Sequence, residues 1–532
     1  MKILIYPPFI DGLKNESKQH RQVISSHNPK TGEKLVDQYP VSTFADLETA
    51  VNNAQFAAGH LGTSLPEKIA RFLETYAENI EANGDEICRM AALETALPYE
   101  PRLKTIELAR TTNQLRQAGA AVRERSWRMA TIDSAANIRS MYGPLNGPVI
   151  VFGPNNFPLA FNAISGGDFA AAIAAGNPVI AKAHPGHLST SRLLAEAAWE
   201  ALDAYGLPRG TVQMFYHCAP EDGLKLVAHP NVAAAAFTGS RGAGLALKQA
   251  ADAAGKPIYL EMSSVNPVYV LPGALAERGE AIAAEFFGSC TMASGQFCTN
   301  PGLIIVPQGQ DGEKFLQTAA ALFQNNASGP LLSEFGAANI QRSLSVLQKA
   351  GAEIVTGGTG DGFRHTNTLL RVSGEAFLVD PAGLQTEAFG PVSLVVMARD
   401  AQEMTATAAS LEGNLTGTIY SDSQGSDDDA YDRLAPVLAT KVGRLLNDKM
   451  PTGVAVSPAM VHGGPYPATG HPGFTAVGIP ASIHRFAALR CYDNVRQHRL
   501  PPELRDENPT GDMWRLVDGR WTQENITSEI AN

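Results

Sequence analysis

VIVFGPNNFP, residues 149–158, reads as a short buried strand, a turn at Gly153 and the beginning of a helix that is predicted to span 156–175. The order of strand, turn and helix then repeats, with further apolar runs at 178–182, 212–216, 232–237 and 258–261. Strands that alternate with helices of this length indicate a doubly wound parallel sheet, so the predicted fold class is α/β. Ligands of such sheets bind at the carboxyl ends of the strands.

The residues that follow these strands include several that can bind a ligand. Lys182 ends the second strand, TGSRGAG (238–244) follows the fourth, and Glu261 ends the fifth. The usual dinucleotide fingerprint of glycines directly after the first strand is absent. GTGDG (358–362) offers a similar glycine spacing, but it opens no helix, and we interpret it as a surface loop.

Length and charge restrict the class of protein. A chain of 532 residues is too long for one hydrophobic core, which predicts two domains of ~150–250 residues and some smaller pieces. The net charge of −11 argues against nucleic acid or an anionic membrane as a partner, and simple solubility explains it. No apolar run approaches the ~20 residues of a membrane span. The N-terminal apolar run lacks a cleavage site, so we expect a soluble cytoplasmic protein.

Five cysteines are scattered along the chain at positions 88, 218, 290, 298 and 491. Their odd number and irregular spacing predict a reducing compartment, no disulfides and no metal site. Cys298 stands out because SGQFCTNPG (294–302) places it in a glycine-flanked turn, where backbone N–H groups can face its sulfur. A free thiol is ~1–3 per cent ionised at neutral pH, so a nucleophile at this position needs donors or a base. The alternative is a buried structural cysteine.

Five ordered motifs carry a family resemblance: PNNFP (154–158), FTGS (237–240), LEM (260–262), GQFC (295–298) and EAFGP (387–391). With them, about residues 20–490 resemble the NAD(P)-dependent aldehyde dehydrogenase superfamily. The resemblance implies a dinucleotide-binding domain (1–126 and 146–262) and a second α/β catalytic domain (263–469). It also implies a small β oligomerisation extension (127–145 and about 470–500), before a polar C-terminal extension (501–532).

The resemblance implies three catalytic residues. Cys298 would attack an aldehyde to give a thiohemiacetal and, after hydride transfer, a thioester. The Asn156 amide and the Cys298 backbone N–H would stabilise the oxyanion, and Glu261 would be the general base that releases the acid. Taken alone, Glu261 could equally be a solvated carboxylate at a strand end, and Asn156 a helix N-cap. The loop around His462 is expected to return across this site.

Cofactor contacts are implied in the same way. Lys182 would bind the adenosine ribose, Gly239 and Ser240 would place a helix N-terminus at the pyrophosphate, Glu387 would hold the nicotinamide ribose, and Phe389 would pack near the ring. Relatives selective for NAD often carry a glutamate where this chain has Pro185. Without that carboxylate a 2′-phosphate meets no repulsion, so NADP and NAD both stay open.

The divergent motifs indicate a branch of the superfamily. MVHGGPYPATG (460–470) and RTTNQLR (110–116) resemble the branch that oxidises 2,5-dioxopentanoate, with NADP-dependent medium- and long-chain aldehyde dehydrogenases as the second resemblance. A substrate with a distal carboxylate favours an arginine, and Arg110 is the candidate, although it could be a charge on a helix surface. Phe157 and Phe161 could form the wall of a substrate tunnel or belong to the core.

Two rival functions share part of this pattern. A coenzyme-A-acylating relative would use Cys298 and Asn156 but commonly lacks the base that Glu261 supplies. A catalytically silent relative could be kept as a binding protein. The joint presence of the three residues argues against both, and a homodimer or homotetramer that acts on a small aldehyde is expected.

Overall fold

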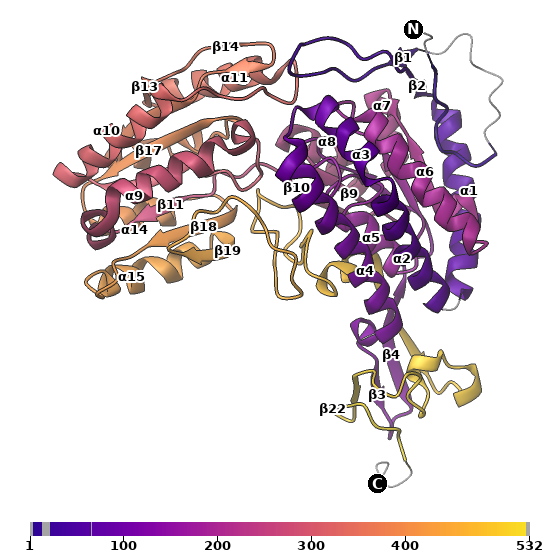
Figure 1. Cartoon of the computed structure of the whole chain (residues 1–532). Helices are drawn as coiled ribbons and strands as arrows, with labels where there is room; N and C mark the ends of the chain where they lie inside the picture. The colour runs from indigo at the N-terminus through magenta and orange to yellow at the C-terminus, as the bar shows by residue number, and fades with distance from the viewer. Residues whose placement is uncertain (1–3, 13–21, 65, 528–532) are drawn as a thin grey trace.

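The computed structural model describes residues 4–12, 22–64 and 66–527. It shows two α/β lobes side by side and a small β sheet that projects from the first lobe (Figure 1). The predicted α/β fold class is confirmed.

The first lobe is built on a parallel sheet of five strands in the order β10-β9-β5-β6-β7. Its strands are β5 (Val149–Phe152), β6 (Val179–Lys182), β7 (Val212–Phe215), β9 (Ala234–Thr238) and β10 (Ile258–Glu261). The first of these strands in the sequence lies in the middle, so the chain winds outward in both directions from it. The resulting switch point between β5 and β9 is where a doubly wound sheet binds its ligand.

Helices cover both faces of this sheet because successive strand residues point to opposite sides. Val149 and Val151 pack against α2 to α6, whereas Ile150 packs against α1, α7 and α8. The helices are α1 (Phe44–Thr63), α2 (Pro66–Ala82), α3 (Gly84–Thr95), α4 (Ala109–Glu124), α5 (Gly167–Ala174), α6 (Leu188–Ala204), α7 (Pro220–Val227) and α8 (Arg241–Ala253). A π-helical stretch, η2 (Tyr99–Leu108), leads into α4.

The second lobe holds a seven-stranded sheet in the order β13-β16-β17-β12-β11-β18-β19, parallel except for β13. The strands are β11 (Val268–Val270), β12 (Leu303–Pro307), β13 (Glu353–Thr356), β16 (Thr368–Ser373), β17 (Val392–Ala398), β18 (Asn414–Tyr420) and β19 (Val442–Asn447). One face packs on α9 (Pro272–Thr291) and α10 (Gln310–Asn325). The other packs on α11 (Gly336–Lys349), α12 (Gly374–Val379), α14 (Ala401–Ala409) and α15 (Asp428–Ala439). No helix of the described residues has both the length and the apolar character that crossing a bilayer requires.

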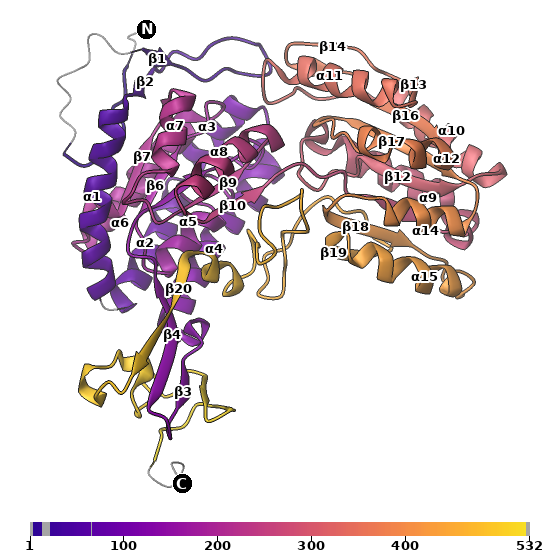
Figure 2. The same cartoon turned by 180° about the vertical axis from the view of Figure 1, so that it is seen from behind.

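The projecting sheet joins segments that are far apart in the sequence (Figure 2). Its order is β20-β4-β3-β21-β22, with β3 (Thr131–Asp133), β4 (Ile138–Pro144), β20 (Ala487–Asp493), β21 (Arg515–Val517) and β22 (Arg520–Thr522). The C-terminal extension therefore adds two strands to this sheet within the same chain. It is held by Arg515, which is fully buried and donates to the carbonyls of Arg505, Asp506 and Glu524. The division of the chain into a dinucleotide-binding domain, a catalytic domain and an oligomerisation extension stays a prediction.

The helix expected over 156–175 begins later than predicted. Residues 156–166 form a series of turns, and only Gly167–Ala174 is helical. Pro158 disfavours a helical conformation at Phe157, and the Asn162 side chain closes the turn by donating to the Pro158 carbonyl at 2.8 Å. The turns place Asn156 and Phe157 just beyond the carboxyl end of β5, and neither residue is part of a helix.

The segment between β19 and β20 runs between the two lobes (Figure 1). It is fixed to the end of β10 by backbone hydrogen bonds from Met262 N to Ala468 O (2.8 Å) and from Gly470 N to Leu260 O (3.1 Å). Glu261 and Thr469 form an isolated bridge between them. The loop that carries His462 is thereby brought to the carboxyl edge of the first sheet.

Candidate active site

Cys298 lies in a strained turn that few other residues could form. Ala293, Ser294 and Gly295 have φ values of 48°, 56° and 68°, which for non-glycine residues cost about 1–2 kcal/mol each. A Cβ on Gly295 would overlap the carbonyl oxygen of Gly390, so this position requires glycine. Backbone strain of this kind needs support from the surroundings.

Asn266, a residue that the sequence did not single out, holds the backbone that follows these strained residues. Its side-chain nitrogen donates to the Cys298 carbonyl at 2.9 Å and to the Asn300 carbonyl at 2.8 Å. Its side-chain oxygen accepts from the hydroxyls of Ser264 and Thr416, each at 2.9 Å. This buried network fixes the backbone from Cys298 to Asn300.

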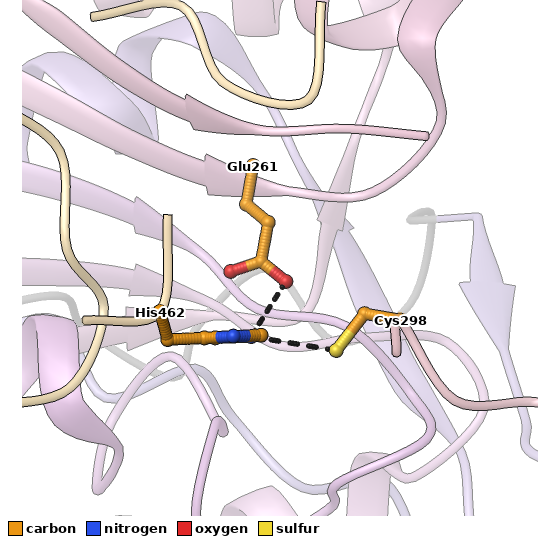
Figure 3. A group of neighbouring side chains, drawn as sticks. All are labelled: Glu261, Cys298 and His462. Carbon is orange, nitrogen blue, oxygen red and sulfur yellow. Dashed lines mark hydrogen bonds and ion pairs between the residues drawn. The ribbon is translucent and has the colours of Figure 1, made fainter. Parts of the chain in front are cut away.

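Three side chains from distant segments meet at the thiol (Figure 3). His462 Nε2 lies 3.4 Å from Cys298 Sγ and 3.0 Å from Glu261 Oε1. Glu261 and His462 are each only 2% exposed, so Glu261 is not the solvated carboxylate that its place at a strand end also allowed. Glu261 Oε2 is buried and has no hydrogen-bond partner in the part of the chain that the structure describes.

His462 is positioned through its own backbone. Its N–H donates to Thr475 Oγ1 at 3.1 Å, and its carbonyl accepts from Ala476 N at 2.9 Å. The imidazole also lies beside the Phe161 ring, with 5.8 Å between ring centroids. The sequence indicated that this loop crosses the site but gave His462 no role, because nothing in an irregular segment predicts which side chain reaches the sulfur.

The environment of Cys298 favours the neutral thiol. Burial raises the pKa of Cys298 well above its usual range, and the carboxylate of Glu261 raises it further. The charge of Arg110 acts in the opposite direction with a smaller effect. The glycine-flanked turn alone therefore does not favour the thiolate. A base must take the proton when the sulfur attacks.

The amide of Asn156 faces the Cys298 turn. Asn156 is 7% exposed, and its Nδ2 donates to the Gln296 carbonyl at 3.0 Å, which leaves one N–H of the amide for another acceptor. The alternative role as a helix N-cap is excluded because no helix begins there. Arg102 donates to the Asn156 carbonyl at 3.1 Å and pairs with Glu107, which fixes the turn from the other side.

An aromatic wall adjoins these residues. The Phe157 ring packs edge-on against Phe161 and Phe297, with ring centroids 5.3 Å apart in both pairs. Arg110 lies over Phe161, with its guanidinium carbon 5.0 Å from the ring centroid. Its Nη1 donates to Val454 O at 2.7 Å, whereas Nε and Nη2 are buried without a partner. Arg110 is thus not a charge on a helix surface.

The predicted cofactor residues lie at the edges of the same region. Burial lowers the pKa of Lys182 to about 8, and among the described residues its ammonium has no hydrogen-bond partner. Ser240 directly precedes α8, and its side chain makes no capping hydrogen bond to the helix. The first N–H groups of α8 are therefore open to an anion. Glu387 accepts from Ser264 N at 3.3 Å, and burial raises the pKa of Glu387 to about 7. Glu387 and Phe389 line one cavity with Phe297.

These observations fit a dinucleotide. The ammonium of Lys182, which has no acceptor among the described residues, matches a ribose hydroxyl. The uncapped N-terminus of α8 matches a pyrophosphate, and the carboxylate of Glu387 matches the second ribose. Of the two histidines that follow Lys182, His187 has both ring nitrogens engaged and is not free to add to this set. His184 Nδ1 accepts from Gly186 N at 3.0 Å, and the buried His187 contacts Ser191 and the Pro154 carbonyl.

The raised pKa of Cys298 gives a prediction for alkylation by iodoacetamide, which reacts with thiolate. Because the Glu261 charge raises that pKa, Glu261→Gln lowers it and increases the thiolate fraction at neutral pH. We expect Cys298 of this variant to be alkylated several-fold faster at pH 7, with the pH profile shifted to lower pH. Mass spectrometry of the Cys298 peptide measures the rate.

The exposed Cys491 is an internal reference, since its rate is expected to be the same in both proteins. Slower alkylation of Cys298 in the variant would show that Glu261 removes the thiol proton instead of opposing ionisation.

The fold and the site together define a class of two-lobed α/β enzyme, in which a partly buried thiol lies between a dinucleotide-type sheet and a second α/β lobe. Residues 15–453 match the profile of the aldehyde dehydrogenase family, and the chain belongs to this family. It is therefore an NAD(P)-dependent enzyme that oxidises an aldehyde, which confirms the family and the cofactor class predicted from the motifs. The roles of individual residues stay predictions.

Named relatives cover nearly the whole chain. Alpha-ketoglutaric semialdehyde dehydrogenase 2 of Azospirillum brasilense is 40% identical over 514 residues, covering 93% of this chain and 96% of the relative. Alpha-ketoglutaric semialdehyde dehydrogenase of Acinetobacter baylyi is 37% identical, covering 91% and 92%. Among solved structures, lactaldehyde dehydrogenase of Escherichia coli superposes with a TM-score of 0.78 at 22% identity, covering 92% and 98%, a likeness of fold.

Proposed function

We propose that this enzyme oxidises a semialdehyde with a distal carboxylate, of the 2,5-dioxopentanoate type, to the corresponding dicarboxylate. Arg110 is the main support for this substrate class. Its guanidinium has two buried nitrogens without partners among the described residues, and its charge lowers the pKa of Cys298. A planar guanidinium binds a carboxylate bidentately. The names of the two relatives above, which are 40% and 37% identical, support the same substrate class.

The first half of the reaction uses Cys298, His462 and Asn156. The sulfur attacks the aldehyde carbon while His462 Nε2, 3.4 Å away, accepts the thiol proton. The free N–H of the Asn156 amide and the backbone N–H of Cys298 donate to the developing oxyanion. Lys182, Ser240 and Glu387 would hold NAD(P), which would supply the hydride acceptor when bound.

The second half releases the acid from the Cys298 thioester. Glu261 Oε2 has no protein partner, so it can accept a hydrogen bond from a water and remove its proton as the water attacks. The thiolate that leaves is reprotonated through His462, which lies in contact with both groups. The buried carboxylate beside the sulfur favours hydrolysis over release to a coenzyme A thiol.

The assembly and the compartment belong to the same proposal. β20 lies at one end of the projecting sheet, and its backbone edge can pair with another copy of the chain. Leu489 on this strand is 62% exposed and would be covered by such a contact. A homodimer or homotetramer is proposed on this basis. A cytoplasmic location is proposed because all five cysteines are free thiols.

Replacing Arg110 with methionine tests the substrate class. We expect kcat/KM for 2,5-dioxopentanoate to fall by roughly 10²-fold, because a carboxylate would enter a buried site without its partner. For pentanal, which has the same chain length and no carboxylate, we expect a change of less than about threefold. Steady-state rates of nucleotide reduction for both aldehydes measure the difference.

Arg89→Met is the matched control, because it removes an exposed arginine from α3. Equal losses of kcat/KM for both aldehydes would mean that Arg110 only supports the structure of the site and does not bind the substrate carboxylate. A wild-type preference for pentanal would favour a medium-chain aldehyde dehydrogenase instead.

A further inference from the structure

Cys298, His462 and Glu261 form a set of zinc ligands as well as a catalytic group. We propose that this set binds one Zn²⁺ per chain, and that the bound ion reversibly inhibits the enzyme. The inhibition rests on the proposed function, whereas the binding depends only on the geometry of the three side chains.

The three donor atoms lie close enough together to share one ion, and the two distances from His462 Nε2 are near those of a tetrahedral site. Cys298 Sγ, His462 Nε2 and a carboxylate oxygen of Glu261 all lie within 4.8 Å of one another. Typical Zn–S, Zn–N and Zn–O bond lengths put tetrahedral ligand atoms about 3.4–3.6 Å apart. The distances of 3.4 Å from Nε2 to Sγ and 3.0 Å from Nε2 to Oε1 require shifts of a few tenths of an ångström.

The surroundings also favour a cation. A thiolate and a carboxylate give two negative charges, which equal the charge of the ion, and the neutral imidazole adds a nitrogen ligand. Glu261 Oε2 is buried and has no partner among the described residues, so the carboxylate offers a free oxygen beside Oε1, the oxygen that contacts His462. Cys298 is only partly buried, which leaves a route for the ion and a fourth position for water. Three protein ligands with an open fourth position are a common zinc arrangement.

Binding and turnover exclude each other. The thiol proton of Cys298 is released to solvent as the Zn–S bond forms. The sulfur electron pair that would attack the aldehyde is then shared with the ion, and the same ion occupies the imidazole nitrogen and the carboxylate. A chelator that removes the ion restores all three groups, and no group is oxidised or reduced.

Cobalt(II) titration of the wild-type enzyme tests the proposal, because a thiolate–cobalt bond gives a charge-transfer absorption that does not depend on turnover. We expect one equivalent of Co²⁺ to bind with this band, Zn²⁺ to displace it, and Mg²⁺ to leave it unchanged because Mg²⁺ prefers oxygen ligands. Zn²⁺ should abolish dehydrogenase activity at the same one-to-one ratio, and EDTA should restore it.

Variants separate this site from the other thiols. Cys298→Ala should abolish the charge-transfer band, and His462→Ala should weaken Co²⁺ binding ~10²-fold or more, while far-ultraviolet circular dichroism checks that both fold. Cys491→Ser removes the exposed thiol and should change neither binding nor inhibition.

A band that survives Cys298→Ala, or affinity unchanged in His462→Ala, would overturn the proposal. Aldehyde oxidation without a cobalt band would remove only this inference. A cobalt band in a protein that oxidises no aldehyde would remove only the proposed function.

Discussion

Cys298→Ala is expected to lower dehydrogenase turnover by ~10⁴-fold or more, because no other described group can form the covalent intermediate in its place. Binding of NAD(P) should change by less than about threefold, since the contacts proposed for Lys182, Ser240 and Glu387 do not involve the sulfur. Steady-state rates measure the first effect, and nucleotide titration followed by fluorescence measures the second.

The control is Cys290→Ala, which removes a fully buried thiol on α9. It should lower stability by about 1 kcal/mol through a small cavity and leave turnover within about twofold of the wild type. Substantial turnover by Cys298→Ala would contradict the assignment of the nucleophile.

Glu261→Gln is expected to slow steady-state turnover by ~10²–10³-fold and to retain a burst of reduced nucleotide. The burst is retained because His462 can still accept the thiol proton, whereas the water that cleaves the thioester loses its base. Rapid mixing with aldehyde and NAD(P), followed at the absorbance of the reduced nicotinamide, should show close to one equivalent per active chain and then a slow phase.

Glu353→Gln is the matched control, since that side chain is 75% exposed on β13 in the second lobe. It should show wild-type kinetics in both phases. Loss of the burst in Glu261→Gln, with the slow phase unchanged, would assign Glu261 to the attack of the thiol instead of to release of the acid.

The sequence predicted the sheets well because buried parallel strands leave a simple signal. Runs such as VIVF (149–152) have apolar residues on both faces, and the strand begins and ends where the run does. The helix expected at Asn156 was placed too early because the side chains of Asn162 and Ser165 close local turns within 156–166. The C-terminal strands gave little signal, since Arg515 fixes them through carbonyls instead of through an apolar pattern.

Part of the candidate site was predicted because some of its residues occupy regular positions in the fold. Cys298, Glu261 and Asn156 follow strands or lie in glycine turns, positions that a doubly wound fold brings together. His462 lies 164 residues from Cys298 in a segment without helix or strand. Its position is set by backbone contacts with Thr475 and Ala476 and by the bridge between Glu261 and Thr469, and none of these leaves a sequence pattern. Asn266 acts through backbone carbonyls, and neither its type nor its spacing predicts that role.

The most direct test is the mass of the Cys298 peptide after Glu261→Gln is mixed with 2,5-dioxopentanoate and NAD(P), then quenched in acid during the slow phase. We expect that peptide to carry the acyl group of the substrate in a hydroxylamine-sensitive bond, and no other cysteine peptide to carry it. An unmodified Cys298, in a sample that has already produced one equivalent of reduced nucleotide, would contradict covalent catalysis by this thiol.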